Sequence, residues 1–508
     1  MAWLHSLTWF TISFLVPLIL WSKFRNRSSK VRRPPGPPGW PLIGNIFDVG
    51  TEPHQNFHKL QSRYGPVLWL KLGTLNTVVI QSATAANELV KKHDLAFSDR
   101  RVPDSMTACD YHKGSMAFAA YGEYWRVLRR LSSSELMVQK RINDSMPLRR
   151  KCIDKMIQWI KEDASGSRFG GGSGEIQLDK YLLIMSFNLV SNFMLSRDIM
   201  DLKSEMGNEF FEAINKFISW NGKPNVVDTF GFLKWLDPQG IRRNTEKHLK
   251  ELLNLVSGFV KERIQEKQLG REKETRDFLD ALLEYEGDGK GASDKLSEKN
   301  VTIFILEMFL GGTETTSNTT QWAMAELLRN PDSMTKLKDE LDRVVGHSRT
   351  VEEGDLNELP YLQAVVKETM RLRPSLPLML PRSARQDTDF MGYNIPKNTM
   401  VILNAWAIHR DPDSWKNPFS FKPERFVNSN TDFKGQHYEL IPFGLGRRSC
   451  VGMLMADRMV SLTLARLIQS FDWELPVNVS PENLDMREMI GLSLRMIVPL
   501  KAVPRERK

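Results

Sequence analysis

Residues 443–452 read FGLGRRSCVG, which places Cys450 among three glycines and two arginines. The chain has 508 residues and only two other cysteines, Cys109 and Cys152, so it cannot build a disulfide framework and at least one thiol stays unpaired. Sparse cysteine usage of this kind is typical of a reducing compartment. We therefore expect Cys450 to be a free thiol or thiolate.

A thiolate serves either as a nucleophile or as a metal ligand. A nucleophile needs a base, and His437 is too distant in the sequence to be an obvious partner. A zinc site needs further Cys or His ligands at short spacing, and the flanks of Cys450 lack them. The remaining interpretation is a single thiolate ligand to an iron that a haem otherwise holds.

The neighbours of Cys450 suit a flat macrocycle. Gly444 and Gly446 allow a tight loop that approaches the cofactor closely. Arg448 can pair with a haem propionate, and Phe443 can shield the sulfur. The alternative is a buried and inert cysteine, which the complete FxxGxRxCxG pattern disfavours.

With this pattern the chain resembles the cytochrome P450 family of haem-thiolate monooxygenases, in its membrane-anchored plant form. The resemblance spans the chain, from an apolar N-terminus and PPGPPG (34–39) to PLKAVP (499–504). It implies a mainly α fold with small β-sheets. It also implies haem b ligated by Cys450, dioxygen, and electrons from NADPH through a flavoprotein, NADPH-cytochrome P450 reductase.

An ExxR pair, Glu368 and Arg371, is expected to lie on one helix face. The same spacing occurs at 123–126 and 326–329, where we interpret it as an ordinary surface pair. The resemblance selects Glu368 and Arg371 and adds Arg425 of the PERF sequence as the third member of a buried cluster. Its implied role is structural, because removing one member of such a cluster strands a charge.

Further cofactor-binding residues follow from the resemblance. Trp125 and Arg129 form a WxxxR sequence on an early helix, and Arg382 follows the ExxR helix. Together with Arg448, these residues are expected to hold the haem propionates through charge-assisted hydrogen bonds.

The sequence GGTETT (311–316) lies within a long apolar helical pattern. Each glycine there costs about 1 kcal/mol relative to alanine, so either the helix tolerates them or something approaches closely. By resemblance, Gly311 and Gly312 open a groove for dioxygen, Thr315 donates a hydrogen bond to the bound dioxygen, and Glu314 relays protons. The alternative is a polar stripe at a helix bend.

Glu307 precedes Gly311 and Thr315 at helical spacing, on roughly the same stripe. Our hypothesis is that it borders the substrate pocket and orients a hydroxyl or amine group. A buried helix–helix polar contact is the alternative. By resemblance, the other substrate contacts are mainly apolar and are Met106, Phe118, Leu310, Leu376, Leu378 and Ile490.

Two features depart from the commoner pattern of the family. Gly311 replaces an alanine, and RLRPSLPL (371–378) replaces RLHPPLPL, which makes Arg373 and Ser375 atypical. Neither change threatens the fold or haem binding, but both bear on the shape of the pocket and on regioselectivity.

The N-terminal segment from Ala2 to Trp21 carries no acidic or basic side chain except His5, and about 20 apolar residues suffice to cross a membrane. Its basic flank follows the apolar run, whereas a cleaved signal peptide has its charges first. We expect a membrane anchor (1–22), a basic flank and Pro-rich hinge (23–45), and one monooxygenase domain (46–508). The positive-inside rule places that domain in the cytosol. The resemblance implies that the single-pass anchor lies in the endoplasmic reticulum membrane.

Periodicity predicts strands at 67–72 and 77–80. Helices are predicted at 82–93, 124–136, 248–264, 297–329 and 359–372.

The net charge is +9, but no zinc-finger spacing or basic tract in the body indicates a nucleic-acid partner. Segments such as GTEPHQNFHKL (50–60) and FKGQHYELIPFG (433–444) most resemble geraniol hydroxylases and iridoid oxidases. We expect a monoterpenoid or iridoid substrate, oxidised once or successively at one carbon, and an acidic reductase face docked near Arg447. The alternatives are a diterpenoid or alkaloid hydroxylase, a reductase-independent P450 that rearranges hydroperoxides, and a non-catalytic haem protein.

Overall fold

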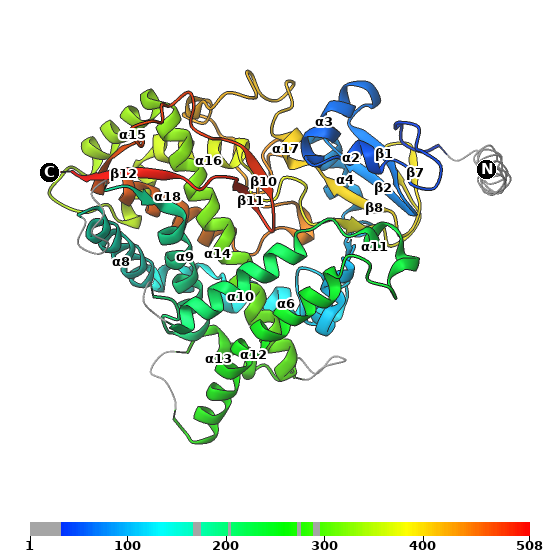
Figure 1. Ribbon diagram of the computed structural model, residues 1–508, viewed down its shortest axis with the longest axis horizontal. Coiled ribbons are helices and arrows are strands. Elements are labelled where there is room, and N and C mark those ends of the chain that lie inside the picture. The colour runs from blue at the N-terminus through cyan, green and yellow to red at the C-terminus, as the bar shows by residue number, and fades with distance from the viewer. Residues whose placement is uncertain (1–31, 166–173, 202–204, 272–275, 288–294, 508) are drawn as a thin grey trace, which may run out of the picture.

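A large helical region and a smaller strand-rich region make up the fold (Figure 1). The computed structural model describes residues 32–165, 174–201, 205–271, 276–287 and 295–507. The expected anchor (1–22) and the first part of the basic flank (23–31) lie outside these residues. Within the described part of the chain, no helix has the length and apolar character needed to cross a membrane.

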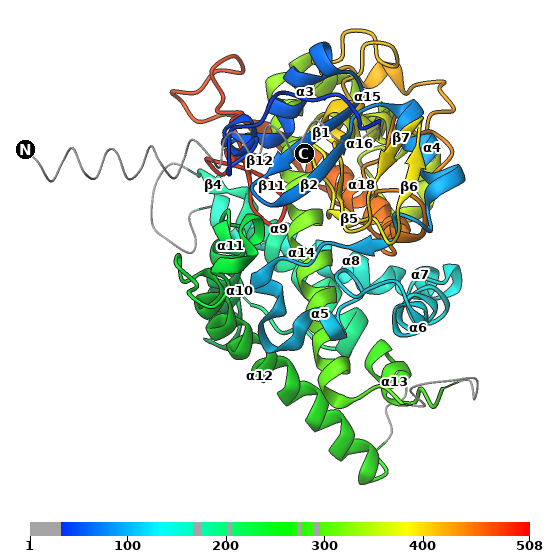
Figure 2. The same cartoon turned by 90° about the vertical axis from the view of Figure 1, so that its right-hand side faces the viewer.

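Helix α14 (Glu298–Arg329) runs through the centre of the helical region (Figure 2). It begins where the Ser297 side chain accepts a hydrogen bond from the N–H of Asn300, with 3.2 Å between the atoms, and it ends before Pro331. The other longer helices are α3 (Pro53–Tyr64), α4 (Ala83–His93), α6 (Glu123–Leu131), α8 (Met146–Ala164), α9 (Leu178–Leu195), α10 (Glu205–Asn221), α12 (Ile241–Gln268), α15 (Pro331–Val344), α16 (Pro360–Leu372) and α18 (Met453–Ser470).

The strand-rich region holds a five-stranded sheet in the order β1-β2-β8-β5-β3. Its only parallel pair, among the described residues, is β2 with β8. The strands are β1 (Val67–Leu72), β2 (Leu75–Ile80), β8 (Met400–Leu403), β5 (Arg382–Ser383) and β3 (Asp99–Arg100). This sheet places Arg382 and Arg100 on neighbouring strands, directly opposite each other.

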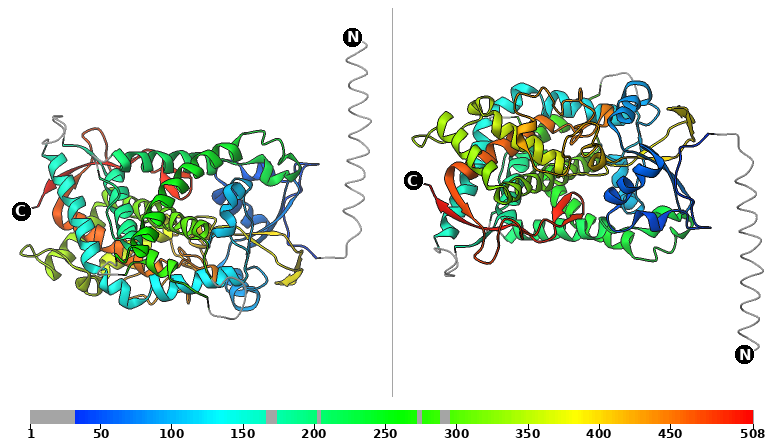
Figure 3. Two further views of the ribbon diagram at one scale, coloured as in Figure 1. Left: turned by 90° about the horizontal axis from the view of Figure 1, so that it is seen from below. Right: turned by 90° about the horizontal axis from the view of Figure 1, so that it is seen from above.

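Three smaller sheets complete the structure. One is the hairpin of β10 (Glu488–Ile490) and β11 (Leu494–Met496), and another pairs β6 (Thr388–Phe390) with β7 (Tyr393–Ile395). The third has the order β4-β12-β9 and consists of β4 (Ile176–Gln177), β12 (Lys501–Glu506) and β9 (Phe471–Glu474). Seen from below and above, the strand-rich end and the β12 end lie on opposite sides of the helices (Figure 3).

The predicted strands and helices are confirmed, most with small shifts of their ends, but two differ more. The helix predicted at 248–264 begins already at Ile241 and ends at Gln268. The helix expected at 124–136 ends at Leu131, and residues 132–136 form a π-helical turn. The hydroxyls of Ser132, Ser133 and Ser134 each donate to the carbonyl four residues earlier. Competition of this kind for backbone acceptors loosens the end of a helix.

Candidate active site

The loop that holds Cys450 is fixed by its glycines. Gly444 and Gly446 have φ angles of 72° and 59°, in the left-handed region that other residues seldom adopt. The N–H of Cys450 donates to the carbonyl of Phe443 with N and O 2.8 Å apart. Cys450 keeps part of its surface open to solvent in this loop, although its thiol lies among protein atoms.

The electrostatics of Cys450 suit a metal-bound thiolate. Burial among the surrounding atoms raises the pKa of the thiol, while the Gly452 N–H and Arg129 oppose that rise. A free thiol therefore stays protonated near neutral pH, and coordination to a metal would remove its proton. Phe443, which packs edge-on against Phe433 with ring centroids 5.0 Å apart, stands beside the loop.

Helix α14 has one exposed backbone position in an otherwise buried stretch. Gly311 is exposed, and a Cβ added there would have no atom within 4 Å. One turn on, Thr315 donates its hydroxyl to the Gly311 carbonyl, with 2.7 Å between the oxygens. A Cβ added to Gly312 would instead lie 2.8 Å from Cγ2 of Val190, so this second glycine allows close packing against α9.

Glu314 is a buried carboxyl beside Thr315. Burial raises the pKa of Glu314, and hydrogen bonding from Ser493 offsets the rise only in part. Among the described residues, its Oε2 atom has no hydrogen-bond partner. A carboxyl that has a raised pKa and an oxygen without a hydrogen-bond partner is suited to pass protons.

Three arginines form a cationic cluster: Arg382 and Arg448 are buried, and Arg100 is half-buried. Burial and then repulsion from the other two lower the pKa of Arg100 well below its usual value, and burial followed by repulsion from Arg382 lowers that of Arg448 to about 10. Within the described part of the chain, Asp94 pairs with Arg382 at 3.1 Å, whereas Arg100 and Arg448 form no ion pair. Such a cluster needs anions, and the two propionates of haem match this need.

Arg100 is a site residue that the sequence did not reveal. It donates to the carbonyls of Ala117, at 3.0 Å, and Leu380, at 2.5 Å. In the sequence it stands next to Arg101, and nothing in the local pattern distinguishes the two. Strand pairing between β3 and β5 is what brings Arg100, and not Arg101, opposite Arg382.

Trp125 and Arg129 on α6 also reach the cysteine loop. Arg129 donates to the Ser449 carbonyl, with 2.6 Å between the atoms. The Trp125 ring lies under the Arg448 guanidinium, 4.6 Å from its centroid, and donates its N–H to the Met116 carbonyl. The structure therefore brings together the residues expected to bind propionates; the contact with propionates itself stays a prediction.

The Glu-Arg-Arg cluster is assembled and buried. Arg371 binds Glu368 through two N–O contacts of 2.7 and 2.9 Å, and Arg425 contacts the same carboxylate at 3.0 Å. Arg371 also donates to the carbonyls of His409 and Pro418, both at 2.7 Å. The cluster thus ties α16 to the chain that leads to the cysteine loop.

Glu307 is engaged by a loop. Its carboxylate accepts hydrogen bonds from the N–H groups of Met116 and Ala117, at 2.7 and 3.0 Å, and from the Ser115 hydroxyl. Glu307 of α14 therefore makes its buried polar contact with a loop. The alternative stated above, a contact between two helices, is wrong. Burial raises the pKa of Glu307, and the three donors counteract this.

The remaining residues expected to contact substrate occupy different environments. Met106 and Leu310 are buried in the large helical core, and Phe118 packs against it. Leu378 packs instead against the core that surrounds β1. Leu376 and Ile490 are half-buried. Their contact with substrate stays a prediction.

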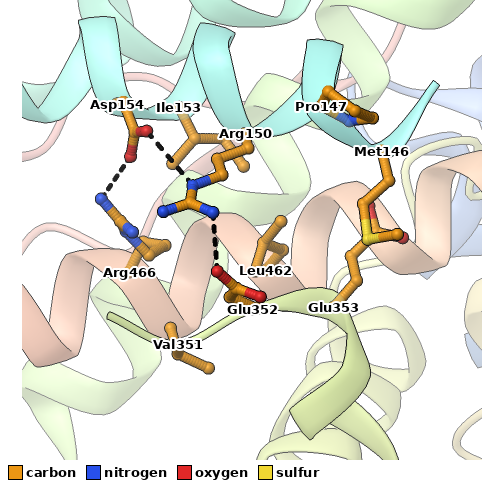
Figure 4. A pocket seen from close by; sticks show the side chains of 10 residues that line it. All are labelled: Met146, Pro147, Arg150, Ile153, Asp154, Val351, Glu352, Glu353, Leu462 and Arg466. Carbon is orange, nitrogen blue, oxygen red and sulfur yellow. Dashed lines mark hydrogen bonds and ion pairs between the residues drawn. The ribbon is translucent and has the colours of Figure 1, made fainter. Parts of the chain in front are cut away.

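A separate pocket of about 150 Å³ lies between α8, α18 and the segment that precedes α16 (Figure 4). Four of its charged side chains pair with one another: Arg150 contacts Glu352 at 2.6 Å, and Arg466 contacts Asp154. The fifth, Glu353, pairs with arginines outside the lining.

The fold and the cysteine site define a haem-thiolate enzyme. The model of the family "Cytochrome P450" matches residues 34–498, so the chain belongs to the cytochrome P450 family. It is 52% identical over 494 residues to an iridoid oxidase of Catharanthus roseus, with 97% of this chain and 96% of the relative covered. It is 39% identical to a geraniol 8-hydroxylase of the same plant, with 97% and 98% covered.

A solved structure agrees with the fold. A zebra fish cytochrome P450 with progesterone superposes with a TM-score of 0.74 at 27% identity, covering 89% of this chain and 99% of that one. The protein is a monooxygenase that uses haem, ligated by a cysteine, together with dioxygen and electrons from NADPH that a reductase delivers. When bound, haem activates dioxygen for insertion of one oxygen atom into a C–H bond.

Proposed function

We propose that the protein hydroxylates, or successively oxidises at one carbon, a monoterpenoid or an iridoid. The observation that carries this proposal is the 52% identity to an iridoid oxidase over 97% of the chain. The mainly apolar set of expected substrate contacts supports it, because such a set binds a modest apolar molecule and leaves few polar groups to orient it.

The test is turnover by the haem-loaded protein in microsomes with NADPH and a reductase, on a panel of geraniol, iridoid alcohols, diterpenes and alkaloids. We expect NADPH-dependent products from the first two classes, identified by mass spectrometry. Products from diterpenes or alkaloids alone would overturn the substrate proposal. Product formation from hydroperoxides without NADPH would indicate a rearranging enzyme.

We further propose a single-pass anchor at 1–22 in the endoplasmic reticulum membrane, with the catalytic domain in the cytosol. Large apolar side chains are exposed in two segments that lie next to the β1–β2 turn. The segment around residue 229 is joined to the turn because the Thr74 N–H donates to the Thr229 carbonyl at 3.1 Å. The segment around residue 44 is joined to it because Gly44 forms a β-bridge with Leu72. These side chains are Trp40, Leu42, Phe47, Phe232, Trp235 and Leu236. Exposed apolar patches of this kind favour contact with a lipid surface.

The membrane proposal is tested by alkaline extraction of microsomes that carry the full chain or a chain without residues 1–22. The full chain should stay in the membrane pellet, and a C-terminal tag on it should be open to protease. A protected tag would place the domain in the lumen and contradict the proposal.

We propose NADPH-cytochrome P450 reductase as the electron donor, docked beside the cysteine loop. Arg447 and Arg126 are exposed there and both lie over the Tyr121 ring, 5.7 and 6.0 Å from its centroid. Arg447 also contacts Asp94 at 3.3 Å, so part of its charge is neutralised. Charge-steered docking should make electron transfer slower at high salt.

A further inference from the structure

The β10–β11 hairpin is attached to α14 through its turn. The Leu494 N–H donates to the Ser375 carbonyl at 2.7 Å, and the Trp322 ring N–H donates to the Leu494 carbonyl at 3.1 Å. Asn318 of α14 donates to the Ser493 hydroxyl at 2.7 Å. The bonds from Asn318 and Trp322 hold the end of the turn (residues 491–493) and the start of β11 against the helix that carries Gly311.

The first strand of the hairpin is held by a buried carboxylate. Glu488 contacts Nε2 of His54 at 2.8 Å and Arg373 at 2.9 Å, and its side chain is 7% exposed. Burial opposes its ionisation, but the His54 hydrogen bond and the charge of Arg373 outweigh burial and hold the pKa of Glu488 at about 2. Glu488 is thus charged throughout the neutral pH range.

Arg373 bridges this carboxylate to α14. Its guanidinium also contacts Glu326 at 3.0 Å and lies over the Trp322 ring, 4.4 Å from the centroid. Glu326 is thus buried and paired with Arg373, so the interpretation of 326–329 as an ordinary surface pair is wrong. A planar guanidinium can bind two carboxylates at once, which a smaller side chain cannot do. Arg373 is one of the two atypical residues in RLRPSLPL (371–378), and the other, Ser375, shares a hydrogen bond with Thr319 of α14, with 2.9 Å between the hydroxyl oxygens.

The hairpin also reaches the candidate active site. Ser493 shares Asn318 with Glu314, whose Oε1 lies 3.4 Å from the Asn318 amide nitrogen. Ile490 is the last residue of β10 and lies between Glu488, the first residue of that strand, and the turn. A shift of β10 would therefore move Ile490 and loosen the surroundings of the Glu314 carboxyl together.

We propose that Arg373 and Glu488 are a positioning pair that sets the place of Ile490 and of the 491–493 turn, and thereby the carbon at which substrate is oxidised. Neither residue needs to touch substrate. The pair acts through the hairpin on Ile490 and through Ser493 on Glu314. The proposal rests on the monooxygenase activity on terpenoids proposed above, and it adds the residues that select the product.

The test uses three variants of the haem-loaded protein: Glu488→Gln, Arg373→Met and the double variant that combines these two changes. Each is compared with a control variant, Glu326→Gln. Glu326→Gln is the matched control because it removes the other carboxylate of Arg373 and leaves the hairpin contacts in place. With geraniol as the probe, we expect Glu488→Gln and Arg373→Met to change the product ratio by about fivefold, as for neighbours in one ion-pair network. The double variant should resemble either single variant. Glu326→Gln should stay within about twofold of the unchanged protein, because it keeps the contact between Arg373 and Glu488.

Hydrogen exchange of residues 488–496 provides a readout that needs no substrate. The two single variants should exchange faster there than the unchanged protein, and Glu326→Gln should not. Equal exchange and equal product ratios in all variants would overturn the positioning pair. If the unchanged protein oxidises no terpenoid, the proposed function fails, and the exchange data still decide whether the pair positions the hairpin.

Discussion

The N–H of Met116 donates to the carboxylate of Glu307, with N and Oε2 2.7 Å apart, across 191 positions of sequence. This contact fixes the loop around residue 116 to α14. The same loop gives its carbonyls to arginines, since Met116 accepts from Arg448 at 3.1 Å and Ala117 accepts from Arg100 at 3.0 Å. One carboxylate and two arginines thus hold opposite sides of one loop, and the loop connects α14 to the cysteine region.

Replacing Glu307 by alanine should lower the free energy of unfolding by about 3 kcal/mol, because two backbone N–H groups would lose their acceptor in a buried place. Denaturant unfolding of the haem-loaded protein measures this. Glu298→Ala is the control, since Glu298 is exposed on the same helix and should cost less than about 1 kcal/mol. A Glu307→Ala protein of unchanged stability and weaker substrate binding would favour the substrate-orienting role instead.

Glu314→Gln should remove the pH dependence of coupling, which is the fraction of NADPH consumption that yields product. Because burial raises the pKa of Glu314 above 4.5, the carboxyl carries its proton below the raised pKa and loses it as the pH rises through that value. The fraction of NADPH consumption that yields product should therefore fall with rising pH in the unchanged protein. In Glu314→Gln this fraction should be low and should not change with pH. A variant with the same pH profile as the unchanged protein would argue against the proton relay.

Cys450→Ser should abolish the thiolate-type absorption band of the reduced protein with carbon monoxide, because a serine hydroxyl is a poor iron ligand. Cys152→Ser is the control: Cys152 is buried in α8, and burial raises the pKa of its thiol to about 12, so it is an inert thiol. The band should survive in the control, and survival in Cys450→Ser would refute the ligand assignment.

Arg425→Ala should destabilise the fold by about 3 kcal/mol and reduce haem retention, because the buried carboxylate of Glu368 would lose one of its two cationic partners. Thermal unfolding and haem content report the two effects. Arg505 pairs with Glu474 on the surface, so Arg505→Ala should cost less than about 1 kcal/mol. Equal losses in both variants would contradict the structural role of the cluster.

The two glycines of α14 should respond differently to alanine. Gly311→Ala should fold and retain haem, and it should stabilise the protein without haem by up to about 1 kcal/mol, because alanine favours helix and its Cβ meets no atom. Gly312→Ala should destabilise the protein, since its Cβ would lie 2.8 Å from Val190. Val190→Ala added to Gly312→Ala should restore part of the loss; no recovery would contradict the clash.

The sequence predicted features that depend on local pattern. The bounds of α14 and α16 follow from apolar periodicity and from Pro331 and Pro374 at their ends. The cysteine loop was predicted because its residue types stand next to one another in the chain. Its geometry agrees, with Gly444 and Gly446 at positive φ.

Contacts between distant segments were not predictable in this way. Glu307 was expected to face substrate or a helix, and its partner is a loop 191 residues away. Arg100 joins the site through a strand of only two residues, too short to give a pattern. The partner of Arg373 is Glu488, and sequence spacing carries no signal for an ion pair across 115 positions.

The attachment of the β10–β11 hairpin has a consequence for how new activities arise in this chain. His54, Arg373 and Glu488 lie in three separate segments of the chain and meet only in the folded protein. A library built to diversify the products of the enzyme should therefore sample these positions as well as the pocket wall. Substitutions there can redirect oxidation while leaving every side chain that touches the substrate as it is.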